Sequence, residues 1–190
     1  MSMFWINGAE TALPVPQESD FGSLVRHVRE RMTGPEQIVS RISVNGVPLE
    51  DSDEADLAAV LIADLDTVEV RTQSPREIAV ETLEALLDFS DQLAQVSSTC
   101  GEASDLRRLI DGISIFVESM SQARAALSQE ACSEVDAQEE ELANLLESLL
   151  ASMNQPGKAP QTDLMTHRIP QHFAVWRDLA IPALLNRLEC

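Results

Sequence analysis

The chain has 190 residues, of which 44% are hydrophobic and 24% charged, and its formal net charge is −19. Its length allows one domain or two small ones, and its composition is that of a chain that folds around apolar cores. The acidity excludes broad electrostatic binding to nucleic acid or to an anionic membrane, because both require a cationic protein surface.

The first part of the chain predicts several strands and one helix. Prolines confine the second strand to a sheet edge. Ser19 and Asp20 offer N-cap side chains for a helix over residues 21–32. Asn45-Gly46 predicts a hairpin, because both residues accept the positive φ of a type I′ turn. The predicted strands cover residues 3–7, 12–16, 38–44, 47–49 and 67–72.

This order of elements resembles a ubiquitin-like β-grasp domain over residues 1–73. The resemblance is carried by FWING, FGSLVRHVRERM, RISVNGVPLEDSDEADL and DTVEVRT, in that order along the chain. Ubiquitin-like modifiers and sulfur carriers end in a free Gly-Gly, which occurs nowhere in this chain, so conjugation and sulfur-carrier chemistry are excluded for the chain as it stands. The resemblance leaves a docking or scaffold role, since a fold alone does not define a function.

A domain boundary is predicted at residue 74. Ser74, Pro75 and Glu77 form a capping box that opens a helix. Long amphipathic helices are predicted at about 75–96, 104–127 and 133–153, with Val96, Val117 and Leu150 among their apolar inward positions. Gly112 lowers the stability of its helix by about 1 kcal/mol relative to alanine. We expect that it is tolerated because it permits close helix packing.

The remaining residues predict a linker and a last helical segment. Residues 154–161 are rich in Pro and Gly and are expected to be flexible. The last segment is helical, and Pro170 is expected to end a short helix at Ile169. The predicted fold class is therefore α+β, with a ubiquitin-like domain over residues 1–73 and an acidic bundle of three or four helices over residues 74–190.

The sequence contains no recognisable catalytic, cofactor or metal motif. His167 and His172 lie five residues apart, which does not match helical zinc ligands, and only chance folding would add Cys190 to them. Glycine-rich phosphate loops and paired Glu-x-x-His motifs are absent from the sequence. Cys100 and Cys132 form neither a CxxC motif nor a disulfide framework with the third cysteine. We therefore expect a protein that is not an enzyme, although an unrecognised carboxylate or cysteine site stays open as an alternative.

The distribution of charge favours protein docking. Residues 1–73 carry a net charge of −8, residues 74–160 carry −11, and residues 161–190 carry zero. Phe173, Trp176, Arg177 and Leu179 are the candidate partner-binding residues of the neutral C-terminal segment, because Trp and Arg are enriched at interface hot spots. The other interpretation is that Trp176 seals the bundle. The outer face of the predicted sheet is a second candidate docking surface.

These observations predict an adaptor, assembly factor or chaperone-like protein that docks a more basic partner. The alternative is an acidic mimic that occupies a nucleic-acid-binding site. The sequence shows no secretion signal and no apolar run long enough for a membrane span, so we expect a cytoplasmic protein without direct nucleic-acid or membrane binding. The breadth of the apolar helix faces leaves homodimerisation open.

Overall fold

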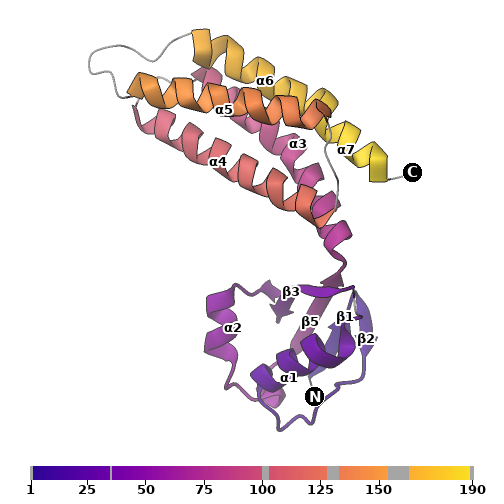
Figure 1. Ribbon diagram of the computed structural model, residues 1–190. Coiled ribbons are helices and arrows are strands. Elements are labelled where there is room, and N and C mark those ends of the chain that lie inside the picture. Colours follow the sequence, from indigo (N-terminus) through magenta and orange to yellow (C-terminus); the bar gives the residue numbers. More distant parts are fainter. Residues whose placement is uncertain (1, 35, 100–102, 128–132, 154–162, 189–190) are drawn as a thin grey trace. The chain divides into compact units, whose positions relative to one another are not determined.

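The computed structural model describes residues 2–34, 36–99, 103–127, 133–153 and 163–188 (Figure 1). The chain divides into two compact units, Met1–Ile78 and Ala79–Cys190. The first unit is built on a β-sheet and the second consists of helices, so the predicted α+β class is confirmed. The predicted linker over residues 154–161 lies outside the described residues.

The N-terminal unit contains a mixed five-stranded sheet in the order β2-β1-β5-β3-β4. The central strand β5 runs parallel to β1 and antiparallel to β3. Alternate residues of these strands are buried on one face, among them Phe4, Val68 and Val70. The strands are β1 Met3–Ile6, β2 Ala9–Thr11, β3 Ile38–Val44, β4 Val47–Pro48 and β5 Thr67–Gln73.

Two Asn-Gly turns connect neighbouring antiparallel strands of this sheet. Asn45 and Gly46 have φ values of 53° and 79°, which confirms the predicted tight turn between β3 and β4. Asn7 and Gly8 make an equivalent turn with φ values of 50° and 76°. The second strand is therefore Ala9–Thr11, and the prediction of a strand over residues 12–16 is wrong.

One helix supplies much of the core beneath the sheet. Helix α1, Phe21–His27, begins where the Asp20 carboxylate accepts a hydrogen bond from the Ser23 N–H at 2.7 Å. It continues directly into the π-helical turn η1, Val28–Met32, so the predicted helix over residues 21–32 is confirmed. Helix α2, Asp51–Leu57, and the 3₁₀ turn η2, Ile62–Asp64, lie between β4 and β5. The helix-side core contains Phe21, Leu24, Val25, Val28, Ile62 and Leu65.

The second unit is a bundle of helices (Figure 1). The predicted capping box is present, because Glu77 Oε2 accepts the Ser74 N–H at 2.7 Å while Ser74 Oγ accepts the Glu77 N–H at 3.2 Å. The helices are α3 Pro75–Thr99, α4 Ala103–Ala126, α5 Ser133–Met153, η3 Leu164–Arg168, α6 Ile169–Val175, η4 Trp176–Ala180 and α7 Ile181–Leu188.

The C-terminal helical segment passes through both of its prolines, Pro170 and Pro182. A π-helical turn ends just before Ile169 and another just before Ile181, and these residues donate their N–H groups to carbonyls five residues earlier. Proline removes one helical donor and its ring collides with the carbonyl four residues earlier. The wider π-helical turn displaces that carbonyl, so the prediction that Pro170 ends a helix is wrong.

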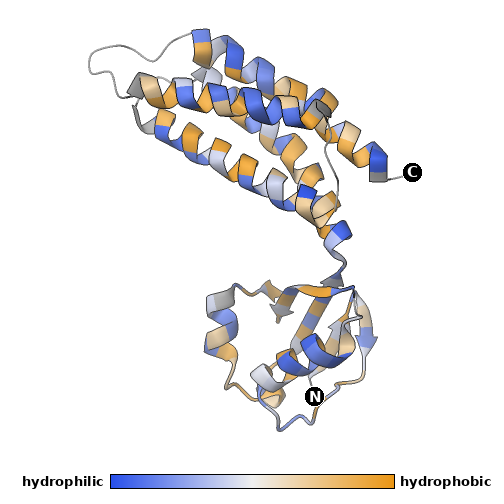
Figure 2. Cartoon of the chain, in the orientation of Figure 1, coloured by the Kyte–Doolittle hydropathy of each residue, from blue (hydrophilic) through white to orange (hydrophobic). Residues whose placement is uncertain are grey.

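A continuous apolar core joins the helices of the bundle. The long helices α3, α4 and α5 carry both hydrophobic and hydrophilic residues along their length (Figure 2). Val96, Val117 and Leu150 are exposed, which corrects their predicted inward placement. On α4, successive residues point about 100° apart, so the buried Phe116 turns its neighbour Val117 away from the core.

Gly112 on α4 is covered by side chains of α3, and the predicted close packing of the helices is seen only as this side-chain contact. A Cβ atom at this position would lie 2.7 Å from Leu93 Cδ2 on α3. Leu93 is buried, and its side chain occupies the space that the absent Gly112 side chain leaves.

Candidate docking surface

The structure places two of the four predicted partner-binding residues in the bundle core. Phe173 and Trp176 each have 0% of their surface exposed. Their rings both pack edge-on against Phe116, with centroid separations of 5.3 Å. A partner cannot reach these side chains while the bundle is folded. The expected contact around Phe173 and Trp176 is therefore corrected, and Trp176 seals the bundle instead.

A buried hydrogen bond fixes the orientation of Trp176. Its Nε1–H donates to His172 Nε2 over 2.9 Å, and the two residues lie four positions apart on one helical segment. Because Nε2 accepts this bond, the imidazole is neutral and carries its proton on Nδ1. Burial lowers the pKa of His172, and the negative charge of Glu141 on α5 partly opposes that shift.

The other two predicted residues lie at the surface. The Arg177 guanidinium donates to Asp91 on α3 and to both carboxylate oxygens of Asp178. These bonds hold the pKa of Arg177 above and that of Asp178 below its ordinary value. Leu179 is exposed over 65% of its surface. Arg177 therefore ties two helical segments together, and Leu179 alone of the predicted apolar residues is accessible.

The histidines do not form a metal centre in the part of the chain that the structure describes. No group of three or more His, Cys, Asp or Glu side chains there could hold a metal ion. His172 is engaged with Trp176, whereas His167 is exposed on η3. Cys100, Cys132 and Cys190 lie outside the described residues, so the weighed combination of histidines with Cys190 is not tested.

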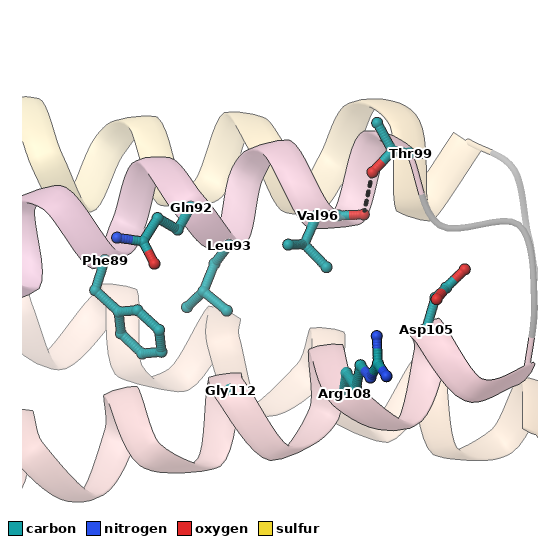
Figure 3. Close-up of a pocket in the computed structure, with 8 residues that line it drawn as sticks. All are labelled: Phe89, Gln92, Leu93, Val96, Thr99, Asp105, Arg108 and Gly112. Carbon is teal, nitrogen blue, oxygen red and sulfur yellow. Dashed lines mark hydrogen bonds between the residues drawn. The ribbon is translucent and has the colours of Figure 1, made fainter.

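Sequence reasoning missed a groove between α3 and α4, which run antiparallel. The groove has a volume of about 340 Å³. Phe89, Leu93 and Val96 extend into it from α3, and Asp105 and Arg108 approach from α4 (Figure 3). Gln92, Thr99 and Gly112 complete its lining. The one sequence signal for this groove is Gly112, whose missing side chain leaves space between the two helices.

The bundle surface carries carboxylates that are not paired with basic side chains. Arg124 pairs with Asp136 at 2.7 Å and with Glu139 at 2.6 Å, which links α4 to α5. Seven other exposed carboxylates of α3, α4 and α5 form no salt bridge within the described ranges. These unpaired groups are Glu84, Asp88, Asp111, Glu118, Glu140, Glu141 and Glu147.

The N-terminal unit offers a sheet face and a hollow. Trp5 lies between Glu10 and Glu69 on the sheet face opposite the core, and Arg41 lies beside Arg71. The hollow, about 420 Å³, lies between α1 and α2, where Arg29 makes a two-pronged salt bridge with Glu54. This ion pair joins two of the four charged side chains that line the hollow, the others being Arg26 and Glu30.

Comparisons with known proteins give no family for this chain: no family model matches it, and no curated protein or solved structure matches it significantly. Among the described residues, none of the helices combines the length and apolar character needed to cross a membrane.

Proposed function

We propose that this chain is a non-catalytic cytoplasmic adaptor or assembly factor that docks a protein partner with a basic surface. The observation that carries the proposal is the set of exposed carboxylates on α3, α4 and α5 that form no salt bridge with any residue the structure describes. Unpaired surface charges of one sign create a field that accelerates encounter with an oppositely charged partner. Helices α3, α4 and α5 then supply the surface to which that partner binds.

We also propose that the N-terminal unit is a ubiquitin-like β-grasp module. The mixed sheet order β2-β1-β5-β3-β4, with β1 parallel to β5, supports this assignment. The position of α1 between the first hairpin and β3 supports it as well. Without a Gly-Gly sequence, such a module acts as a scaffold or docking surface and not as a conjugated modifier.

The test is capture of proteins from the native lysate by the full chain, with elution by a rising salt gradient. A variant with the unpaired carboxylates of α3, α4 and α5 converted to amides should keep its helical circular dichroism and lose the retained protein. The matched control neutralises the same number of exposed carboxylates on the N-terminal unit. Its substitutions fall at Glu10, Glu18, Glu30, Glu36, Asp56, Asp64 and Glu69.

The proposal requires the bundle variant to lose binding while the control keeps most of it. Equal retention by the wild type and both variants would contradict it. If double-stranded DNA displaces the retained protein, the alternative of a nucleic-acid mimic replaces the adaptor.

A further inference from the structure

We propose that the groove between α3 and α4 is the partner-binding site, and that it takes a bulky apolar side chain from a basic amphipathic helix. This inference rests on the proposed docking function and adds the site and the chemistry of the partner. Helix-in-groove recognition places the apolar residues of one helix face into a hydrophobic depression.

The groove combines an apolar floor with a polar rim. Phe89 is only partly buried and Val96 is exposed over 39% of its surface, so apolar area remains open to solvent. Gln92 and Arg108 stand at the rim (Figure 3). A volume of about 340 Å³ accommodates one or two large side chains but not a whole helix. An anchoring side chain from a helix lying across the opening fits these dimensions.

The apolar surface extends beyond the groove along α4. Ile115 follows Gly112 by three positions, which places it on the same side of α4 one turn further on. Its side chain is 57% exposed although it is large and apolar. Val96, Phe89 and Ile115 therefore form an apolar strip that a second residue of the partner helix can cover.

Charge selects a basic occupant for this strip. Gly112 approaches both Phe89 and Leu93, so Asp88 and Asp111, the residues next to Phe89 and Gly112, stand at the same level on the two helices. Both carboxylates are exposed and make no salt bridge within the described ranges. Asp105 and Arg108 balance each other at the other end, so the net charge around the groove is negative. Lysine or arginine residues beside an apolar anchor complement this pattern.

The probe is a fluorescent helical peptide of about 18 residues with leucine along one face and lysine elsewhere, a length sufficient for a helix. A control peptide carries alanine at every leucine position and keeps the same charge and a high helical propensity. Anisotropy titrations use the full chain, the double variant Val96→Ser/Ile115→Ser and the control Leu150→Ser/Leu179→Ser. The control residues are 48% and 65% exposed and do not line the groove.

We expect the leucine peptide to bind the wild type more tightly than the alanine peptide does. The groove variant should weaken leucine-peptide binding about tenfold, the effect of losing one well-buried apolar contact, and the control should change it by less than about twofold. Asp88→Asn/Asp111→Asn should weaken both peptides more than Glu140→Gln/Glu147→Gln does.

Several results would overturn the proposal. Equal binding of the two peptides, or equal loss of affinity in the groove and control variants, would show that the groove is not the binding site. The proposed docking function would then depend on charge alone. A homodimer that dissociates in the groove variant would make a second copy of the chain the occupant. Absence of binding by either peptide at about 50 mM salt, where exposed charges are weakly screened, would contradict both the groove and the proposed function.

Discussion

Trp176→Phe is the substitution that most sharply tests the role of the buried aromatic cluster. Phenylalanine keeps an aromatic ring next to Phe116 but removes the N–H that Trp176 donates to His172 Nε2. A buried acceptor left without its donor costs about 1–3 kcal/mol. The smaller ring leaves a void that costs about 1 kcal/mol more. We therefore expect Trp176→Phe to lower the free energy of unfolding of the bundle by about 2–4 kcal/mol.

The assay is urea unfolding of the full chain, followed by circular dichroism at a helical wavelength. The chain has two tryptophans, Trp5 in the N-terminal unit and Trp176 in the bundle. In Trp176→Phe the remaining fluorescence comes from Trp5, so it reports the sheet unit as an internal control. A double-mutant cycle with His172→Leu should give a coupling energy of about 0.5–3 kcal/mol. A loss below about 0.5 kcal/mol in Trp176→Phe would refute the reasoning.

Three further predictions concern pH, a turn and a helix cap. The pKa of His172 is lowered in the folded state, so its contribution to stability is complete above the ordinary histidine pKa of about 6.5 and is lost as the pH falls below it. In thermal unfolding measured between pH 7.5 and 5, the wild type should lose more stability than His172→Gln. The glutamine amide oxygen can accept the Trp176 N–H but does not titrate. Parallel curves of melting temperature against pH would contradict this prediction. Gly46→Ala should lower the free energy of unfolding by about 1–2 kcal/mol, because φ is +79° there, whereas Gly34→Ala, in open space and without a positive φ, should not lower it. Both are measured by Trp5 fluorescence in the Trp176→Phe background. Ser74→Ala removes the capping box and should lower stability by about 1 kcal/mol in denaturant unfolding, and an unchanged midpoint would show that this cap is dispensable.

The sequence predicts those parts of the fold in which local chemistry decides the structure. The Asn45-Gly46 turn and the Ser74–Glu77 cap depend on a few neighbouring residues, and both are present. Asn7-Gly8 has the same sequence signal for a turn. The second strand is nevertheless predicted at residues 12–16, because these residues are apolar. The observed strand Ala9–Thr11 is short and largely exposed, so it has no apolar alternation to reveal it.

The accessible residues of the docking surface could not be predicted from the periodicity of apolar residues, because their burial depends on how the helices pack. Trp176 and Leu179 lie three positions apart, yet one is fully buried and the other is exposed, because packing against Phe116 selects one face of the helix. The groove likewise requires α3 and α4 to meet at Gly112, a contact between residues about 20 positions apart in sequence. Gly112 indicated close packing, but its sequence position alone could not identify Phe89 and Leu93 as its neighbours.

The most direct test of the central claim is an amide chemical-shift titration of the isotope-labelled full chain with the leucine–lysine peptide. The groove account predicts that the largest shifts lie in residues 88–99 and 105–115, and that these shifts are lost in Val96→Ser/Ile115→Ser. Shifts of equal size over all the acidic helices, or shifts concentrated on α5 or on the sheet face around Trp5, would contradict it.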